Sequence, residues 1–196
     1  EIIFKSFYES YFKKNKKIST VSARAGNVIG GGDFKINRIV PDAIKAFQKN
    51  RKLFLRNPNA TRPWQHVLEP LNGYITLGEL ILKKKLKINL IPNWNFGPYK
   101  KNCKKVSTLV AMLAREWNTS SKIVVRKNKK QFKETKLLSL NISKSKKELG
   151  WVPVLSFLDT IKFTTDWYKN FFTKKINMKE FSLMQIKKFE ELKLKK

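Results

Sequence analysis

One segment combines residue types that suit the binding of a phosphate group: ARAGNVIGGGD at residues 23–33. A strand that carries Arg24 and Asn27 and runs into consecutive glycines brings backbone amides and a carboxamide to its carboxyl end, where ligands of open α/β sheets bind. The spacing differs from GxGxxG, and no helix follows in the register of a dinucleotide loop. From spacing alone, a flexible glycine turn is favoured over a phosphate site.

A second segment of this kind is TRPWQHV at residues 61–67. Arg62 offers a planar fork of donors that matches a diphosphate, and Trp64 offers a flat apolar wall. His66 is the single histidine of the chain. Because the spacing shows no cysteine, serine or carboxylate partner for its imidazole, a structural histidine is favoured over a catalytic one.

The periodicity of apolar residues predicts the elements that position these segments. Steps of three and four predict helices at 1–14, 41–48, 68–82, 106–117, 158–172 and 178–194. Ser107 is expected to cap the fourth helix, and Ser156 with Asp159 forms a capping box before the fifth. Strands are predicted at 18–22, 52–56, 88–96, 122–126 and 137–141, and a loop at 25–33. This alternation favours an α/β fold, with residues 1–196 as a single unit.

The formal net charge of +29 first suggests a nucleic acid or an anionic surface as the partner. Most of the positive charge is lysine, however, and it is spread along the whole chain. Arginine, the better fork for phosphates and base edges, occurs at seven positions only. A solvated lysine surface is therefore favoured over a selected polyanion face, and nucleic acid is not the expected partner.

The remaining composition narrows the class further. Cys103 is the single cysteine, so it makes no internal disulfide, and it lacks the paired spacing of a zinc site. An incidental thiol is favoured over a nucleophile. No apolar run approaches the length that spans a bilayer, and no secretory leader opens the chain. A soluble, cytoplasmic protein that does not bind membranes is expected.

Six segments carry a resemblance to a known family. They are ARAGNVIGGGD at 23–33, RIVPD at 38–42, RNP at 56–58, RPWQHVLEPL at 62–71, WNFGP at 94–98 and LGW at 149–151. Together they resemble the nucleotide-sugar dehydratases of the extended short-chain dehydrogenase/reductase family, and within these the enzymes that act on CDP-glucose. The segments follow the family's order over nearly the whole chain, and the long RPWQHVLEPL run separates the chain from sibling epimerases.

The resemblance implies a fold and a reaction. The fold is the carboxyl-terminal part of an NAD(P)-binding Rossmann fold, interwoven with a smaller nucleotide-sugar-binding domain. The reaction is that of an NAD-dependent lyase, which removes water from CDP-glucose to give the 4-keto-6-deoxy sugar nucleotide. NAD accepts hydride from C4 of the sugar and returns it to C6, so the cofactor turns over without net oxidation. The intact protein is expected to bind NAD and a nucleotide sugar, and a homodimer is plausible from the family.

The family's motifs assign substrate-binding roles by position. The candidates are Asn27 near the sugar diphosphate, Arg62 at the nucleotide, Arg38 in the segment that packs over the nucleotide, and His66 in the turn beside it. Weaker candidates are Arg24, Asp33 and Asn95, for which a role in holding the loops is the alternative. An asparagine donor and an arginine fork suit a diphosphate. No catalytic, cofactor-binding or metal-binding residue is expected within this chain.

The chain also departs from the family. KET at 133–135 stands where the family has HEA, and LN at 140–141 stands where it has LD. The glycine-rich dinucleotide loop, the acidic dehydration pair and the TyrxxxLys pair are expected before Glu1, so the first strands of the Rossmann sheet are expected to be missing. An unpaired strand edge and an uncovered apolar helix face would follow. The chain alone is expected neither to hold NAD nor to turn over substrate.

Two alternatives stay open. The first is a sibling epimerase or dehydratase of the same family that acts on UDP- or dTDP-sugars, because a few contacts that one sequence does not expose decide the choice of base. The second is a non-enzymatic basic module that binds nucleic acid, which predicts tight, strongly salt-dependent binding of polyanions.

Overall fold

The computed structural model describes residues 1–15, 18–86, 92–126, 135–174 and 176–195. Seven α-helices lie in these ranges: α1 (Ile2–Phe7), α2 (Ile39–Gln48), α3 (Leu68–Leu82), α4 (Val106–Trp117), α5 (Ser143–Leu149), α6 (Phe157–Thr173) and α7 (Met178–Leu194). A π-helical turn, η1 (Tyr8–Phe12), continues α1, and a 3-10 turn, η2 (Lys100–Asn102), precedes α4. The predicted helices at 68–82, 106–117 and 178–194 therefore begin and end where expected.

The strands are short and form pairs within the described residues. They are β1 (Ser22–Ala25), β2 (Asn27–Ile29), β3 (Leu53–Leu55), β4 (Thr61–Arg62), β5 (Trp64–His66), β6 (Asn93–Phe96), β7 (Lys104–Lys105) and β8 (Ile123–Val125). Three pairs are parallel, β1 with β6, β2 with β5 and β3 with β8, and β4 pairs with β7 antiparallel. Parallel strands among helices confirm the α/β class.

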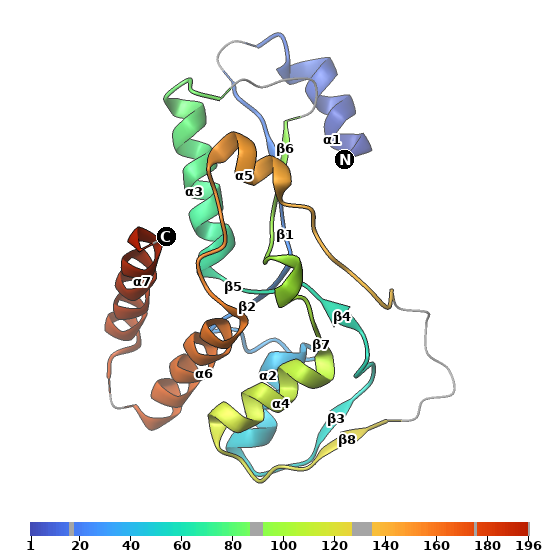
Figure 1. Ribbon diagram of the computed structural model, residues 1–196, viewed down its shortest axis with the longest axis vertical. Helices are drawn as coiled ribbons and strands as arrows, with labels where there is room; N and C mark the ends of the chain where they lie inside the picture. The colour runs from blue at the N-terminus through green and yellow to red at the C-terminus, as the bar shows by residue number, and fades with distance from the viewer. Residues whose placement is uncertain (16–17, 87–91, 127–134, 175, 196) are drawn as a thin grey trace.

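The pairs follow one another down the molecule in Figure 1. β1 and β6 run from the region of α1 toward β2 and β5, with α3 and α5 beside them. β3 and β8 lie at the opposite end with α2 and α4, and α6 and α7 flank the side. The largest core is built from α2, α4 and α6 around β3 and β5, and it includes the fully buried Phe47, Leu109 and Tyr168.

Several predicted strands are wrong in detail. The strand expected at 18–22 is found at Ser22–Ala25, because its register is set by pairing with Asn93–Phe96. The strand expected at 137–141 is a single bridge between Leu137 and Thr61. Residues 25–33 are only partly a loop, since β2 lies inside them. Part of the strand expected at 88–96, residues 88–91, lies outside the described residues.

Helix capping agrees with expectation at one helix and not at another. Ser156 caps α6, where its hydroxyl accepts the Asp159 N–H while the Asp159 carboxylate accepts the Ser156 N–H, which confirms the capping box. Ser107 does not cap α4. The helix already begins at Val106, and the Ser107 N–H donates to the backbone oxygen of Pro58 instead.

The first helix has an apolar side that nothing in the described structure covers. No residue of α1 or η1 is buried, and Ile2, Ile3 and Tyr11 are 87%, 75% and 67% exposed. The apolar periodicity that predicted a helix here is confirmed, and so is the expected uncovered helix face. A stripe of this kind is unusual on a stable surface, because the removal of apolar area from water lowers the free energy.

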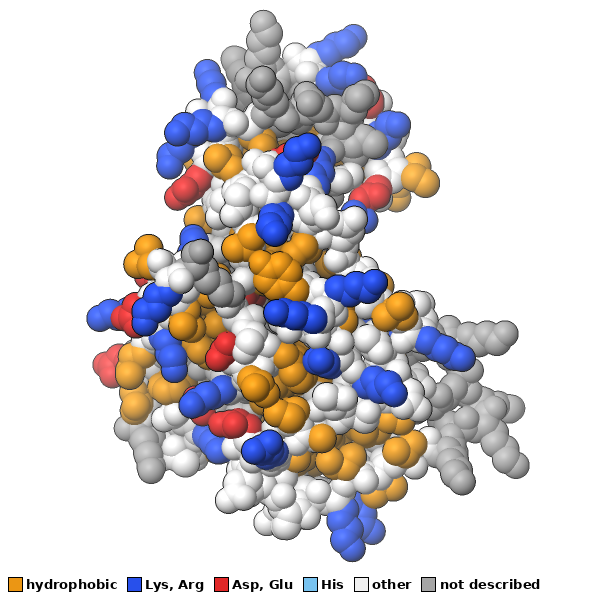
Figure 2. All heavy atoms as spheres, in the orientation of Figure 1, with side chains coloured by type: hydrophobic (Ala, Val, Ile, Leu, Met, Phe, Trp, Pro, Cys, Tyr) orange, Lys and Arg blue, Asp and Glu red, His pale blue; other side chains and the backbone are white. Residues whose placement is uncertain are grey.

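The basic side chains do not gather on the face shown in Figure 2. Lysine and arginine are scattered there among apolar and neutral groups from one end of the molecule to the other. This distribution agrees with the expectation of a solvated lysine surface. In the described part of the chain, no helix is long and apolar enough to cross a membrane.

Candidate functional site

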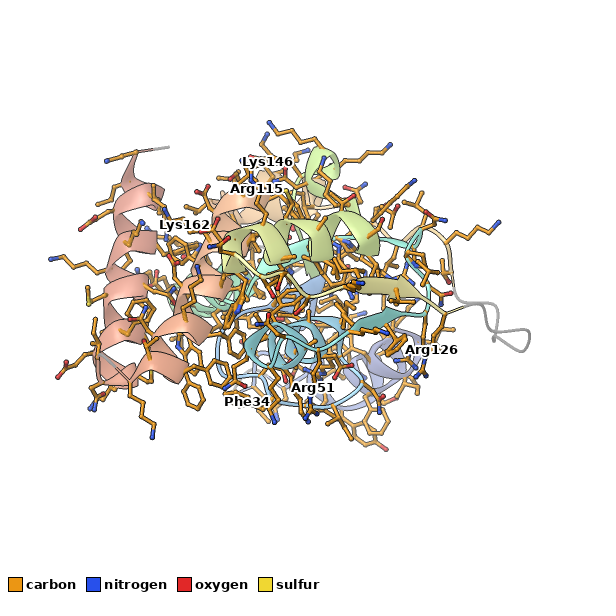
Figure 3. The ribbon with its side chains drawn as sticks, turned by 90° about the horizontal axis from the view of Figure 1, so that it is seen from below. Phe34, Arg51, Arg115, Arg126, Lys146 and Lys162 are labelled. Carbon is orange, nitrogen blue, oxygen red and sulfur yellow. The ribbon has the colours of Figure 1, made fainter. Side chains whose placement is uncertain are left out.

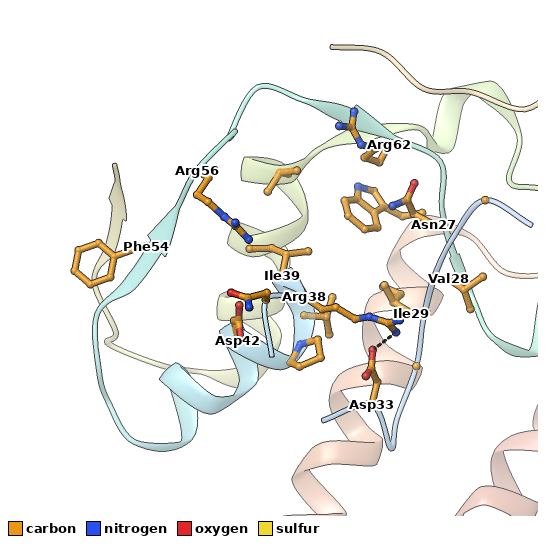
Figure 4. A pocket seen from close by; sticks show the side chains of 17 residues that line it. Asn27, Val28, Ile29, Asp33, Arg38, Ile39, Asp42, Phe54, Arg56 and Arg62 are labelled. Carbon is orange, nitrogen blue, oxygen red and sulfur yellow. Dashed lines mark hydrogen bonds and ion pairs between the residues drawn. The ribbon is translucent and has the colours of Figure 1, made fainter. Parts of the chain in front are cut away.

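A cavity of about 550 Å³ lies where β2, the glycine-rich loop, the start of α2 and the segment from β3 to β5 meet (Figure 4). Four of the residues predicted from the sequence line it, and three do not. Those that line it are Asn27, Asp33, Arg38 and Arg62; those that do not are Arg24, His66 and Asn95.

Asn27 reaches the cavity because β2 begins there. Its backbone N–H donates to the oxygen of Pro63 at 3.0 Å, and Asn27 stands opposite Trp64 in the parallel register with β5. The chain passes very close at this point: a side chain at Gly26 would put its first carbon 2.7 Å from the Pro63 oxygen. Gly26 therefore allows the approach that sets the Asn27 carboxamide beside Arg62 in Figure 4.

Arg62 is buried, with 7% of its surface exposed, and its guanidinium is held in place by backbone carbonyls. One nitrogen donates to the oxygen of Thr61 at 3.0 Å and to that of Thr135 at 2.8 Å. Arginine keeps its charge even where it is buried, and it presents five donors in a fixed fork. A buried arginine on a cavity wall suits the recognition of an anion. Of the KET segment at 133–135, only Thr135 lies within the described residues.

Arg38 and Asp33 form an ion pair on the wall below Asn27. The guanidinium of Arg38 donates to the Asp33 carboxylate at 3.0 Å. Arg38 has an extended backbone and directly precedes the first residue of α2. The start of the helix therefore sets the position of the Arg38 Cα and the direction of its side chain. Arg56 enters from the opposite wall, at the end of β3. Three guanidinium groups thus surround one cavity, an arrangement suited to a ligand with several negative charges.

Trp64 supplies the flat apolar wall expected from the sequence. It is 5% exposed and lines the cavity, while its indole N–H donates to the backbone oxygen of Lys104 at 3.0 Å. The hydrogen bond restrains the indole where it lines the cavity.

His66 lies behind this wall and does not face the cavity. The side chain is buried, it meets the ring of Phe163 edge-on at 5.4 Å, and its Nδ1 accepts the Leu68 N–H at 3.4 Å. Its Nε2 therefore carries the proton, and within the described residues it has no partner. Burial lowers the pKa of the imidazole to about 4. His66 is thus neutral near pH 7, and its role toward a substrate stays a prediction.

Arg24 and Asn95 lie on the β1–β6 pair and bind each other. Arg24 Nε donates to Asn95 Oδ1 at 2.9 Å, and Asn95 Nδ2 donates to the backbone oxygen of Asn141 at 3.0 Å. These bonds hold neighbouring segments together. The sequence had left open that these two residues hold the loops, and their contacts agree with that.

The cavity contains residues that the sequence had not singled out as ligands. Arg56 stands in the RNP segment that carried the resemblance, so a signal for it existed. Asp42 likewise ends the RIVPD segment at 38–42 that carried the resemblance. Phe54 had no such signal, because its place on the wall depends on how β3 packs. The thiol of Cys103 lies outside the cavity, and its pKa is raised by burial, which disfavours the reactive thiolate.

Solved structures show where this fold is found. The chain is similar to the UDP-glucose 4-epimerase of Thermotoga maritima with UDP-glucose (TM-score 0.71, 16% identity, 87% of this chain and 51% of that one) and to the dTDP-glucose 4,6-dehydratase of Bacillus anthracis in complex with NAD (TM-score 0.68, 19% identity, 86% and 49%). The fold is that of the epimerases and dehydratases of the extended short-chain dehydrogenase/reductase family, as the sequence segments implied.

One curated relative matches the chain in sequence. Over 173 residues, 86% of its length, the chain is 34% identical to the CDP-glucose 4,6-dehydratase of Salmonella typhimurium (strain LT2), of which the match covers 47%. The resemblance expected from the sequence is confirmed as a relationship to CDP-glucose 4,6-dehydratase. The chain thus spans about half the length of the curated relative that it matches. No family model matches the chain.

Proposed function

We propose that the cavity binds the nucleoside diphosphate part of a nucleotide sugar, and that the chain is the substrate-binding half of an NAD-dependent CDP-glucose 4,6-dehydratase. The observation that supports this most is the convergence of Asn27, Arg38 and Arg62 on one cavity, since the same three residues were assigned to the substrate by motif position. Buried Arg62 with exposed Arg38 and Arg56 outnumbers the two carboxylates of the cavity, Asp33 and Asp42, and leaves a positive charge that suits a diphosphate.

The reaction of the intact protein would be the loss of water from CDP-glucose to give the 4-keto-6-deoxy sugar nucleotide. NAD would accept hydride from C4 and return it to C6. Of the residues that line the cavity in the described part of the chain, Asp33 and Asp42 are the acidic ones, and none is Tyr, Lys, His, Cys or Glu. Asp33 is already paired with Arg38 at 3.0 Å, so the described part of the lining holds no two free carboxylates. We therefore propose that this chain binds substrate and supplies no proton-transfer pair of its own. Homodimerisation and a cytoplasmic location stay predictions.

Calorimetric titration of the purified chain with CDP, UDP and dTDP tests the binding and the choice of base. We expect CDP to bind most tightly. A preference for UDP or dTDP would favour a sibling enzyme of the same family. Incubation with CDP-glucose and NAD tests the second half of the proposal, because formation of the keto sugar by this chain alone would contradict it.

Arginine variants test whether the cavity is the binding site. Arg38→Gln removes a charge-assisted hydrogen bond, so we expect a Kd for CDP about tenfold higher. Arg51→Gln is the matched control, because it removes the same charge from an exposed arginine outside the cavity (Figure 3), and a change below about twofold is expected. Equal effects of the two changes would contradict the site.

The alternative of a nucleic-acid module has its own test. A labelled oligonucleotide at physiological salt should bind the chain no more tightly than CDP. Tight binding that weakens steeply as salt increases, and that Arg51→Gln and Arg38→Gln reduce equally, would support the nucleic-acid alternative instead.

A further inference from the structure

Asp33 lies at the centre of a small network beside the proposed diphosphate site. One carboxylate oxygen accepts the Arg38 guanidinium at 3.0 Å, and the other accepts the backbone N–H of Lys35 at 3.1 Å. The second bond closes a turn in which the side chain folds over its own backbone. The carboxylate is therefore aimed by its own loop before it meets Arg38.

The backbone of the same loop is fastened from the other side by α6. The hydroxyl of Tyr168 donates to the backbone oxygen of Asp33 at 2.5 Å, and the Tyr168 ring is fully buried. Burial and the nearby Asp33 carboxylate raise the pKa of this hydroxyl to about 12, so it remains a donor at neutral pH. At Gly31, a side chain would put its first carbon 2.0 Å from the Trp167 indole, so the loop lies directly against the helix.

A carboxylate on the wall of a diphosphate site requires an explanation. Asp33 and Asp42 both line the cavity, and either one would repel an anionic ligand if its charge stood alone. The Asp33 carboxylate pairs with one nitrogen of the Arg38 guanidinium. The other donors of the guanidinium can therefore bind oxygens of a ligand. Among the described residues, Asp33 is the group that holds the Arg38 side chain.

We propose that Asp33 is a positioning residue that aims Arg38 into the cavity, and that Tyr168, 135 residues further along the chain, fixes Asp33 from helix α6. The identity of the ligand in this inference rests on the proposed function. The hydrogen bonds that join Tyr168, Asp33 and Arg38 do not depend on it. Asp33 does not bind the diphosphate in this arrangement. It sets the direction of the guanidinium before the ligand arrives, which reduces the cost of ordering a long side chain on binding.

Two isosteric variants separate positioning from simple charge. If charge alone matters, both Asp33→Asn and Asp42→Asn strengthen CDP binding, because each removes a negative charge from the cavity. If Asp33 aims Arg38, Asp33→Asn weakens CDP binding, by about threefold for an ion pair that is 57% and 33% exposed, while Asp42→Asn strengthens it or leaves it unchanged. Tighter binding by Asp33→Asn would overturn the proposal.

The contribution of Tyr168 is tested by Tyr168→Phe, which keeps the buried ring and removes only the hydroxyl. We expect CDP to bind about twofold less tightly, with the thermal midpoint recorded to show that the variant is folded. In an Arg38→Gln background the same change should have no effect, because its influence passes through Arg38. A full effect in that background would overturn the coupling between Tyr168 and Arg38.

A measurement without any ligand completes the test. The Nε–Hε signal of Arg38 in ¹⁵N spectra reports how freely the guanidinium moves, and we expect it to broaden or shift toward the free-arginine position in Asp33→Asn and Tyr168→Phe, but not in Asp42→Asn. Identical Arg38 signals in all four proteins would overturn the proposal. If Asp33→Asn releases Arg38 but the unaltered chain binds no CDP, the proposed function fails and the positioning role stands.

Discussion

Helices α1 and α6 carry similar sequence patterns and differ in what surrounds them. Both have aromatic and aliphatic residues at helical spacing. In α6 this side is buried, with Ile161 at 2% and Phe163 at 3% exposed, whereas in α1 no residue is buried. Periodicity therefore predicts that a helix forms and which side is apolar. Whether that side is covered depends on segments far away in the sequence.

The two helices also begin differently. The start of α6 is fixed by a capping box and by Glu69, whose buried carboxylate accepts the backbone N–H groups of Val154 and Leu155. The start of α1 has no side-chain cap. If these differences matter, changes at the contacts of α6 should cost stability in proportion to burial, and equivalent changes in α1 should cost little.

The largest effect is expected at Glu69 of α3, whose carboxylate holds Val154 and Leu155 in the segment that leads into α6. Glu69→Ala leaves two buried N–H groups without their charged acceptor, which should lower the free energy of unfolding by about 4 kcal/mol. Urea denaturation measures it. Glu79→Gln is the control, because this exposed carboxylate pairs with Lys83 across one helical turn, and the change should cost less than about 0.5 kcal/mol.

Truncation of one apolar side chain in each helix tests the comparison directly. Ile161→Ala should cost about 3 kcal/mol, because it removes buried surface and leaves a cavity. Ile3→Ala should change the free energy of unfolding by less than about 0.5 kcal/mol, because Ile3 is 75% exposed. A large loss at Ile3 would mean that α1 is covered in solution, and the two helices would then be alike.

A pH titration tests the packing of His66 against Phe163 of α6. Burial lowers the folded-state pKa to about 4, below the ordinary value of 6.5, so the unfolded chain binds the proton more readily. Stability is therefore complete above pH 6.5 and is lost as pH falls toward 4. About 2 kcal/mol should disappear between pH 7.5 and pH 5. Because the chain has one histidine, His66→Phe should abolish this slope, and a slope that persists would contradict the assignment.

The smallest effect is expected at the cap of α6. Ser156→Ala removes the hydroxyl that accepts the Asp159 N–H, and it should cost about 1 kcal/mol. Ser107→Ala is the matched control, since Ser107 does not cap α4 and a negligible change is expected there. Equal losses would show that serine content near helix starts, and not the capping geometry, determines the effect.

The sequence predicted the long helices well because their determinants are local. The apolar steps and capping residues of 156–173 lie within the helix itself. The strands were predicted poorly because they are two to four residues long and each is defined by its partner: Ser22–Ala25 is a strand where it meets Asn93–Phe96. Helix α5, with three lysines in seven residues, has too few apolar steps to be recognised.

The candidate site could be predicted only in part, for a similar reason. Motif position identified Asn27, Arg38 and Arg62, and these converge on one cavity. It also proposed His66, whose ring lies against Phe163 and whose role toward a substrate stays a prediction. A motif specifies which residues lie near each other along the chain, whereas the side of a strand that faces the cavity is set by packing. Neighbours such as Arg62 and His66, four residues apart, can therefore reach different surroundings.

The contact between Tyr168 and Asp33 has a consequence for the order of events during synthesis. A chain leaves the ribosome from its amino end at about 5–20 residues per second, so the glycine-rich loop emerges on the order of ten seconds before the helix that fastens it. Contacts of such wide sequence separation also slow folding. The pocket is thus completed late, and the exposed loop must avoid wrong partners until α6 emerges.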